Sequence, residues 1–454
     1  METIAAISTA PGIGGIGIVR MSGEEAFKIL GKIFQQKNDK KGEKIKGYSI
    51  KYGEIINPKT SKIVDEVLVS YFKAPKSYTT ENMCEINSHG NSVVAREILE
   101  ICIENGAVLA EPGEFTKRAF LNGRIDLSQA EATADIINAR TKIEARAAMN
   151  QLEGFLSREI KNIRECALDL LVDMEANIDY PEYDIEEVSE NRVKSSLSKM
   201  KTELQKLLNS FENGKIVKEG IKIAIIGSPN AGKSSLLNAI LKEERAIVTD
   251  IAGTTRDTIE ETVTIEGIPF NIIDTAGIRN ADNEVEKIGI ERSKKIAENS
   301  DLIIAMFDNS KELEKEDEEI LSFIKDKNAL IVLNKIDLGQ KNNIFTQENK
   351  LIINMSVKEE TGIEELYKKL VEMFNINKIN LDNENMVTSI RHKNLIEEAI
   401  KSLIKAEETI NLGMPIDIIA INIKDIIENL SKITGENVSE DILKEIFSKF
   451  CLGK

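Results

Sequence analysis

The sequence has no tryptophan, only two histidines and four cysteines, and no long apolar run. No stretch approaches the ~20 apolar residues that a helix needs to cross a bilayer, so we expect no membrane insertion. The cysteines Cys84, Cys102, Cys166 and Cys451 include no Cys-x-x-Cys pair, which argues against a disulfide framework and against a zinc site. Residues 1–6 lack the basic segment of a secretory signal. These absences predict a cytoplasmic protein.

An excess of positive charge is also missing, because the formal net charge is −16. This balance argues against a broad nucleic-acid surface, although a local basic patch or a partner can supply one. The composition, 41% hydrophobic and 30% charged, is that of a globular protein. At 454 residues the chain is too long for one core, and the usual ~100–200 residues per domain predicts about three domains.

The periodicity of apolar residues changes three times along the chain. Residues 1–120 mix β-like runs with helical spacing, which predicts a small α+β domain. Residues 121–215 carry long amphipathic helical patterns, which return in residues 378–454. Between them, residues 216–377 alternate strands and helices, the signature of a mainly parallel sheet. We therefore predict a multidomain α/β plus α protein, with an α/β domain inserted into a discontinuous helical domain.

Individual elements follow from the same patterns. Strands are predicted at Thr3–Ser8, Gly17–Arg20, Lys51–Ile56 and Glu66–Phe72, and helices at Glu24–Phe34, Val93–Glu104, Arg391–Ile410, Ile416–Ile433 and Ser439–Phe450. His89 is interpreted as a turn residue, and His392 as a helix cap or surface group. Gly12–Gly17 matches G-x-G-x-x-G but leads into a strand-like run, which favours a turn, or a loop that approaches some other ligand, over a dinucleotide site.

A glycine-rich run stands between a strand-like and a helical pattern. It reads Gly-Ser-Pro-Asn-Ala-Gly-Lys-Ser over residues 227–234 and follows the apolar run Lys222–Ile226. In such a loop the backbone N–H groups turn inward around phosphate at a helix N-terminus. Lys233 is then expected to reach the β- and γ-phosphates, and Ser234 to bind Mg²⁺. The run predicts a nucleoside triphosphate ligand.

A second motif selects the base. Asn334-Lys335-Ile336-Asp337 follows the apolar run Ala329–Leu333, and there the Asp337 carboxylate can accept hydrogen bonds from N1–H and the exocyclic amine of guanine. Adenine would set a lone pair against the same carboxylate, and such mispairing discriminates strongly. The loop Asn354–Lys358 is the expected companion, with a backbone N–H toward guanine O6. The predicted substrate is GTP.

Two further motifs belong to the γ-phosphate side. Asp274-Thr275-Ala276-Gly277 ends an apolar run, which places a carboxylate near the Mg²⁺ and a backbone N–H beside the γ-phosphate. Thr254 and Thr255 lie between this motif and the glycine-rich loop, where a switch threonine completes the metal shell.

The residue after Gly277 is Ile278, not the glutamine that orients water in signalling GTPases. Asn230 can instead bind a monovalent cation whose shell is completed by oxygens of residues 249–255, and such a cation neutralises developing charge as an arginine finger does. Alternatively, a carboxylate in Glu284-Val285-Glu286 can orient the water, although its charge spacing is also that of an ordinary helix surface.

The sequence closely resembles the MnmE (TrmE) family of tRNA modification GTPases from Thr3 to its last residue. The motifs that carry the resemblance are residues 227–234, 249–257, 284–292, Pro112–Arg124 and the terminal Cys451-Leu452-Gly453-Lys454. The nucleotide motifs alone would also fit ribosome-assembly GTPases, so an alternative reading is a GTP-dependent switch in ribosome or RNA assembly without its own modifying chemistry. The flanking motifs are more restrictive.

The resemblance implies a homodimer that works with an FAD-dependent partner protein on certain tRNAs. The implied reaction adds a carboxymethylaminomethyl or aminomethyl group at C5 of wobble uridine 34. A tetrahydrofolate, in its 5-formyl or 5,10-methylene form, would supply the one-carbon unit.

The resemblance also assigns residues to roles. It implies potassium at Asn230, Thr249, Ile251 and Thr254, Mg²⁺ at Ser234 and Thr255, and catalysis by Lys233, Thr255 and the water-orienting Glu286. It implies folate binding by Arg20, Glu85, Arg124 and Lys454. Cys451 is either a reactive thiol or a residue that fixes the tail, and no local base is seen that would lower its pKa. The full predicted GTP site is Asn230, Ala231, Gly232, Lys233, Ser234, Ser235, Thr249, Asp250, Ile251, Ala252, Gly253, Thr254, Thr255, Asp274, Thr275, Ala276, Gly277, Asn334, Lys335, Asp337, Ser356 and Lys358.

Overall fold

The computed structural model describes residues 2–37, 48–179, 190–242, 260–274, 296–339, 350–374, 376 and 385–453. They form two compact units. The first unit comprises Met1–Ile137, Ala148–Leu204 and Asn394–Lys454, and the second comprises Asn138–Ala147 and Gln205–Lys393.

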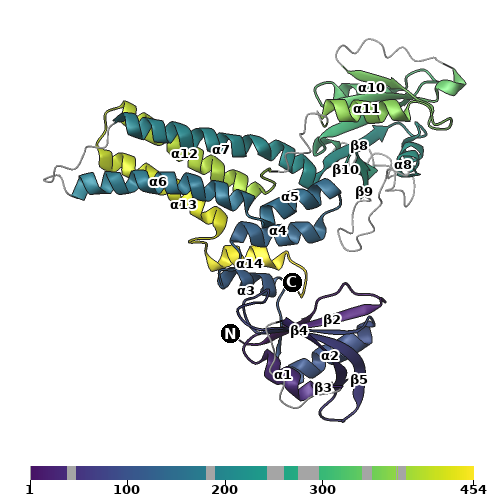
Figure 1. The fold of residues 1–454 in the computed structure, drawn as a ribbon. Coiled ribbons are helices and arrows are strands. Elements are labelled where there is room, and N and C mark those ends of the chain that lie inside the picture. Colours follow the sequence, from purple (N-terminus) through teal and green to yellow (C-terminus); the bar gives the residue numbers. More distant parts are fainter. Residues whose placement is uncertain are drawn as a thin grey trace. The chain divides into compact units, whose positions relative to one another are not determined.

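The first unit begins with a seven-stranded sheet in the order β3-β4-β5-β6-β2-β1-β7, antiparallel except for the β1–β7 pair (Figure 1). The strands are β1 Ile4–Ile7, β2 Ile16–Ser22, β3 Phe34–Gln36, β4 Tyr48–Ile56, β5 Ile63–Phe72, β6 Met83–His89 and β7 Val108–Leu109. Helices α1 (Ala26–Ile33) and α2 (Ser92–Glu104) supply Leu30 and Ile98 to a core shared with Val69 and Ile86 of the sheet. The predicted strands and helices of this region are confirmed, whereas β3, β6 and β7 were not predicted.

His89 was wrongly interpreted as a turn residue, because it ends β6 and is held by Asp65 of β5. Its backbone N–H donates to Asp65 Oδ2 at 2.8 Å, and its ring Nδ1 lies 2.7 Å from Asp65 Oδ1. The hydrogen bond and the charge of this carboxylate raise the pKa of His89. Because the pKa of His89 is higher in the folded than in the unfolded protein, the pair with Asp65 adds stability that is fully present below pH ~6.5, the ordinary pKa of histidine. This stability is lost as the pH rises through the raised pKa.

We therefore expect the pKa of His89 to lie above ~6.5 and to return towards that value in the variant Asp65→Asn. The measurement is an NMR titration of the ring protons, which is simple because the chain has two histidines. An identical His89 pKa in both proteins would contradict the assignment.

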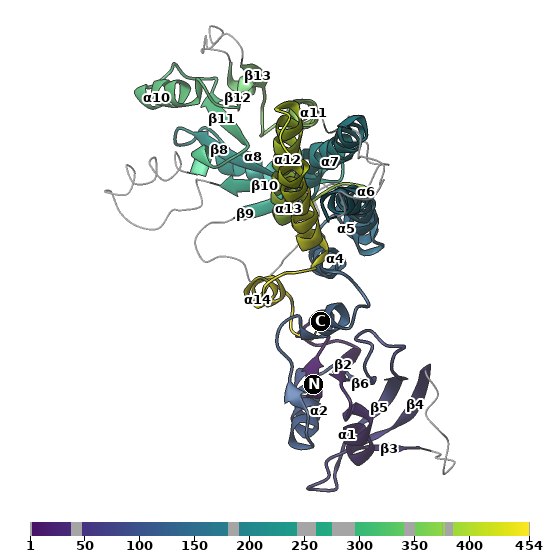
Figure 2. The same cartoon turned by 90° about the vertical axis from the view of Figure 1, so that its left-hand side faces the viewer.

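Long helices make up the rest of the first unit. The helices of this part, some of which continue into the second unit, are α3 Glu114–Leu121, α4 Leu127–Asn138, α5 Lys142–Leu152, α6 Phe155–Asp179, α7 Glu190–Glu219, α12 Ile390–Asn411, α13 Ile416–Thr434 and α14 Glu440–Ser448. The limits between the two units fall within α4, α5, α7 and α12. Helices α6 and α13 run side by side (Figures 1 and 2) and bury Ile160, Met174, Ile423 and Leu430. The three C-terminal helices predicted from the sequence are confirmed.

His392 was wrongly placed at a cap or on the surface. It lies in the first turn of α12 and is 0% exposed, with Nε2 2.9 Å from Nη2 of Arg391. Ile396 and Ala399, at helical spacing after His392, are equally buried, so the histidine belongs to the apolar stripe of the helix. Among the helices that the structure describes, none has the length and apolarity to cross a membrane.

The second unit contains a six-stranded sheet in the order β13-β12-β11-β8-β10-β9, in which only β9 runs antiparallel. Its strands are β8 Ile221–Gly227, β9 Glu260–Ile265, β10 Ile268–Asp274, β11 Leu302–Asp308, β12 Ala329–Asn334 and β13 Leu351–Asn354. The described helices beside it are α8 Lys233–Lys242, α10 Lys315–Ile324, α11 Ile363–Met373 and the short 3₁₀ helix η1 Ile336–Leu338. The expected mainly parallel sheet is confirmed.

Both faces of this sheet are covered. Ile223 and Ile225 of β8 belong to one hydrophobic cluster, whereas Ala224 and Ile226 belong to another. Alternate residues of a strand point to opposite faces, so a strand buried on both sides needs a continuous apolar sequence. Because β8, β11 and β12 run parallel, their carboxyl ends meet at one edge of the sheet. This edge is where open α/β sheets bind ligands.

Candidate nucleotide site

The glycine-rich loop joins the end of β8 to the start of α8. Asn230 and Gly232 have φ angles of +65° and +108°, which turn the chain sharply back towards the helix. The Lys233 ammonium donates to the carbonyl oxygens of Gly227 at 2.7 Å and Ser228 at 2.9 Å. The loop therefore curves around the side chain of Lys233, and α8 begins at the same residue.

Asn334 ends β12 and ties this loop to the loop after β13. Its Nδ2 donates to the carbonyl of Ala231 at 2.9 Å, and its Oδ1 accepts from the backbone N–H of Val357 at 3.1 Å. The side chain is 3% exposed. Asn334 and Ala231 were predicted as nucleotide ligands, and the structure places Asn334 as the buried link between the phosphate side and the base side.

Asp337 lies in η1 and is oriented by Ser356. The Ser356 hydroxyl donates to Asp337 Oδ1 at 2.7 Å, and the backbone N–H of Glu359 donates to the Ser356 oxygen at 3.3 Å. Ser356 is 1% exposed, whereas Asp337 is exposed. The Ser356 hydroxyl therefore holds one carboxylate oxygen of Asp337, while the residue as a whole is exposed to solvent.

Lys335 stands between the two sides and is held by Asp308, a residue that the sequence reading missed. The Lys335 ammonium lies 2.6 Å from Asp308 Oδ2, and Ser310 donates to Oδ1 of the same carboxylate from its N–H and its hydroxyl. Burial by itself raises the pKa of Asp308, but Lys335 and Ser310 outweigh it and leave that pKa below its ordinary value. Asp308 ends an apolar strand as Asn334 does, which is the signal that could have revealed it.

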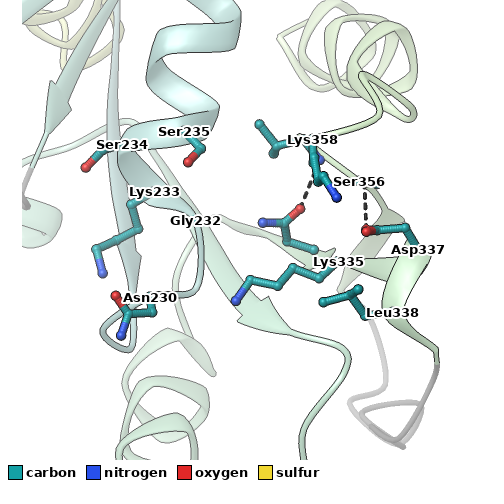
Figure 3. A pocket seen from close by; sticks show the side chains of 12 residues that line it. Asn230, Gly232, Lys233, Ser234, Ser235, Lys335, Asp337, Leu338, Ser356 and Lys358 are labelled. Carbon is teal, nitrogen blue, oxygen red and sulfur yellow. Dashed lines mark hydrogen bonds between the residues drawn. The ribbon is translucent and has the colours of Figure 1, made fainter.

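Residues of the glycine-rich loop, of η1 and of the loop after β13 line one cavity of about 590 Å³, within the ~300–1,000 Å³ range of small-molecule sites. Figure 3 shows Asn230 and Lys233 on its phosphate side and Asp337 with Ser356 on its base side. The lining residues are Asn230, Gly232, Lys233, Ser234, Ser235, Asn334, Lys335, Asp337, Leu338, Ser356, Val357 and Lys358. All but Leu338 and Val357 were predicted, and both of these adjoin a predicted residue.

Other predicted residues lie outside the part of the chain that the structure describes. They are Thr249, Asp250, Ile251, Ala252, Gly253, Thr254, Thr255, Thr275, Ala276, Gly277, Glu286 and Lys454. Asp274 ends β10, and its backbone position pairs with Ile225 of β8.

The predicted folate residues lie in the first unit. Arg20 of β2 faces its register partner Glu85 of β6, with Nη2 and Nε at 2.7 and 2.9 Å from Oε1. Arg124 donates to the carbonyl of Tyr78 at 3.1 Å, and its guanidinium lies 4.7 Å from the Tyr78 ring centre. Arg20 lies 6.0 Å from the same ring. The structure therefore places two of the four predicted residues, Arg20 and Arg124, beside Tyr78, an aromatic residue that the sequence analysis missed, and pairs Arg20 with a third, Glu85.

All four cysteines are free thiols in the structure. Cys84 and Cys102 are buried, and burial raises the pKa of Cys102 to about 12. Cys451 is exposed. Within the described ranges, no group of three or more His, Cys, Asp or Glu side chains is arranged to hold a metal ion.

Comparisons with known proteins place the chain in a family. A profile of the GTP-binding protein TrmE N-terminus matches residues 3–124, and a profile of the MnmE helical domain matches residues 127–451. The tRNA modification GTPase MnmE of Acetivibrio thermocellus is 51% identical over 457 residues, which cover 100% of this chain and 99% of that protein. The chain belongs to the MnmE family of tRNA modification GTPases. The MnmE of Alkaliphilus oremlandii is 49% identical over the same shares of both chains.

Membership in the MnmE family confirms the expected fold class and the expected GTP hydrolase acting in tRNA modification. Among solved structures, the G domain of the FeoB iron transporter of T. maritima is 26% identical, covering 34% of this chain and 97% of that domain, with a TM-score of 0.26. The MnmE assignment rests on the sequence comparisons.

Proposed function

We propose that this chain is a potassium-activated GTPase that modifies C5 of wobble uridine 34 in certain tRNAs together with a flavoprotein partner. The added group is carboxymethylaminomethyl or aminomethyl, and a tetrahydrofolate supplies its one-carbon unit. The observation that carries the GTPase part is the cavity that joins Lys233 of the glycine-rich loop to Asp337 and Ser356. The family membership supports the tRNA part.

The same proposal includes a cytoplasmic homodimer and a division of labour along the chain. Residues 1–120 bind folate and dimerise, residues 121–215 and 378–454 form the helical domain, and residues 216–377 hydrolyse GTP. The flavoprotein contributes to tRNA binding, which fits a chain whose net charge is −16.

The described residues fit GTP with Mg²⁺. Ser234 stands in the first turn of α8, exposed on the cavity wall, where its hydroxyl can bind the metal beside the phosphates. The Lys233 ammonium, now on the carbonyls of Gly227 and Ser228, neutralises the β- and γ-phosphates, and the Asp337 carboxylate reads guanine. Thr255, Asp274 and the backbone of residues 275–277 complete the γ-phosphate side, and Glu286 orients the water.

Asn230 fits the role of a potassium ligand. It is exposed, lines the cavity beside Lys233 and has an amide oxygen, a ligand that suits a hard cation. Thr249, Ile251 and Thr254 would supply the remaining oxygens. A cation bound there supplies positive charge where negative charge develops during phosphoryl transfer.

We expect GTP hydrolysis to be at least about tenfold faster in KCl than in NaCl, because a smaller ion leaves the carbonyl shell incomplete and removal of one such charge is worth several kcal/mol. The measurement is phosphate release at constant ionic strength. Asn230→Ala should be slow in both salts, whereas Asn238→Ala, on the exposed side of α8, should keep the potassium dependence. Equal wild-type rates in the two salts would exclude the cation mechanism.

The Arg20–Glu85 pair and Arg124, which lies on the Tyr78 ring, fit a folate. Glu85 is an acceptor suited to the donor-rich edge of a pterin, and the Arg124 guanidinium suits a carboxylate. Arg20 and Lys454 complete the predicted set.

The whole proposal is tested by mass spectrometry of tRNA from a strain that lacks the gene. We expect the C5 modification of wobble uridine to disappear, to return with the wild-type gene and to stay absent with Lys233→Ala. Unchanged wobble uridine in the deletion strain would refute the tRNA assignment and favour a GTP-dependent assembly switch.

A further inference from the structure

Asp308 and Lys335 stand at the ends of two neighbouring strands of the second unit. Asp308 ends β11 and is the register partner of Asn334, which ends β12, so Lys335 is the first residue beyond that pair. The two chains stay together after the strands, because the backbone N–H of Asn309 donates to the carbonyl of Asn334 at 2.8 Å. The parallel register therefore brings together a carboxylate and an ammonium that lie 27 positions apart in the sequence.

The main chain on both sides of Lys335 is hydrogen-bonded. The φ angle of Lys335 is +65°, which is uncommon for a residue with a side chain and turns the chain out of β12 into η1. The carbonyl of the preceding Asn334 accepts from Asn309, and the N–H of the following Ile336 donates to the carbonyl of Met355 at 3.3 Å. With the backbone fixed in this way, the part of Lys335 that still has to be ordered is its flexible four-carbon side chain.

Asp308 orders that side chain. The Lys335 ammonium lies 2.6 Å from Asp308 Oδ2, while Oδ1 accepts from the N–H of Ser310 at 3.0 Å and from its hydroxyl at 2.6 Å. The Asp308 side chain is 11% exposed, so both oxygens are engaged in a mostly buried position. Figure 3 shows the side chain of Lys335 running from the side of Asp337 towards that of Asn230. The stem of Lys335 therefore lines the cavity between its base side and its phosphate side.

The ion pair also restrains the charge of Lys335. If its ammonium moved to a phosphate, the mostly buried carboxylate of Asp308 would lose its counter-charge, and a buried charge without a partner is strongly destabilising. The methylene stem of a lysine can instead cover a ligand while its ammonium stays on another group. Lys335 is thus suited to offer its stem to the nucleoside rather than its charge to the phosphates.

We propose that Asp308 is a positioning residue for nucleotide binding, which holds the stem of Lys335 as a pre-ordered wall for the nucleoside. Asp308 is not among the residues that line the cavity, so it acts through Lys335. Because the lysine is already ordered when the nucleotide arrives, the entropy cost of fixing a long side chain does not weaken binding. The inference rests on the proposed assignment of this cavity to GTP.

The test uses the full chain and the isosteric variant Asp308→Asn, which keeps an oxygen for Ser310 but sets an amide donor against the Lys335 ammonium. Calorimetry with Mg²⁺ measures the affinity for GDP and for a non-hydrolysable GTP analogue. We expect both to bind about fivefold to tenfold more weakly, and by the same factor, because the nucleoside is common to the two ligands. The matched control is Glu372→Gln, which breaks the 2.7 Å pair with Lys369 outside the cavity lining and should bind both as the wild type does.

Steady-state hydrolysis supplies a readout that a general loss of structure would not give. A wall that contacts the nucleoside equally before and during phosphoryl transfer contributes uniform binding. In Asp308→Asn the KM for GTP should therefore rise by about the same factor as the dissociation constant, while kcat at saturating GTP stays within about twofold of the wild type.

A double-mutant cycle tests the link through Lys335. Lys335→Ala should weaken the binding of both nucleotides, and adding Asp308→Asn to it should cause no further loss, because the side chain to be positioned is gone. Ser310→Ala loosens the carboxylate but keeps both charges, so it should weaken binding by about twofold. This variant decides the question if circular dichroism shows that Asp308→Asn does not fold, and wild-type affinity in it would then overturn the inference.

The outcomes separate the role of Asp308 from the assignment of the cavity. Wild-type affinities in a folded Asp308→Asn, or a further loss when it is combined with Lys335→Ala, would overturn the inference while Lys335→Ala alone still binds weakly. A larger loss for the GTP analogue than for GDP would also overturn it, because Lys335 would then serve the γ-phosphate. Wild-type affinity in both Lys335→Ala and Asp337→Asn would instead refute the assignment of the cavity to GTP, and the role of Asp308 with it.

Discussion

We expect Asp337→Asn to hydrolyse xanthosine triphosphate in preference to GTP. The carboxylate, held by Ser356 at 2.7 Å, can accept from both N1–H and the amine of guanine. Asparagine offers one acceptor and one donor, which match the N1–H and the carbonyl of xanthine but set a donor against the guanine amine. Since a hydrogen bond to a charged group is worth ~1.5–3 kcal/mol, the ratio of kcat/KM for the two nucleotides should change by on the order of a thousandfold.

The matched control is Asp326→Asn, an exposed aspartate of the second unit that does not line the cavity. It should leave the preference for GTP unchanged. Ser356→Ala should weaken GTP binding by less than Asp337→Asn, because it frees the carboxylate without replacing it. An Asp337→Asn variant that still prefers GTP would show that the base is read elsewhere.

The second large effect is expected at Gly232. A Cβ at this position would lie 2.2 Å from Asn334 Nδ2, and φ is +108°. To make room, Asn334 must leave Ala231 and Val357, so the phosphate and base sides lose their buried link. Backbone strain of ~1–3 kcal/mol and broken buried hydrogen bonds of ~1–3 kcal/mol together predict at least about a hundredfold weaker GTP binding for Gly232→Ala. Fluorescence titration with a labelled nucleotide measures it.

Gly339 separates the two causes. Its φ of +107° is nearly the same, but nothing lies within 4 Å of its Cβ position. Gly339→Ala therefore reports backbone strain alone and should bind GTP far better than Gly232→Ala. Adding Asn334→Ala to Gly232→Ala should cost little further affinity, because the link is already broken. Equal losses at both glycines would reject the role of Asn334.

Residues whose role follows from local order were predictable. Ile223–Ile226 of β8 is buried on both faces of the sheet, and Lys233 and Asp337 each follow an apolar strand at a short spacing. Partners distant in sequence were not. Asn334 bonds the carbonyl of Ala231, 103 positions earlier, and Ser8 bonds Gly453, 445 positions later. No periodicity encodes such a meeting, because it depends on how several elements pack.

Register and burial explain the remaining differences. Arg20 and Glu85 were expected as separate folate ligands, but pairing of β2 with β6 sets them opposite each other and makes them an ion pair. The pairing partner of a strand is a property of the whole sheet. His392 was expected at a cap or on the surface because it begins a helix, but it lies on the buried stripe of that helix with Ile396 and Ala399.

The pairing of β9 with β10 has a mechanical consequence. Glu260, where β9 begins, is the register partner of Ile273, and the next residue, Asp274, pairs with Ile225 near the end of β8. Glu260 and Asp274 therefore lie at neighbouring register positions, beside the strand that leads to Lys233. The main-chain hydrogen bonds of β10 connect both positions to β8. Main-chain hydrogen bonds do not depend on side-chain identity, so this connection between β9, β10 and β8 can persist while the surrounding residues change.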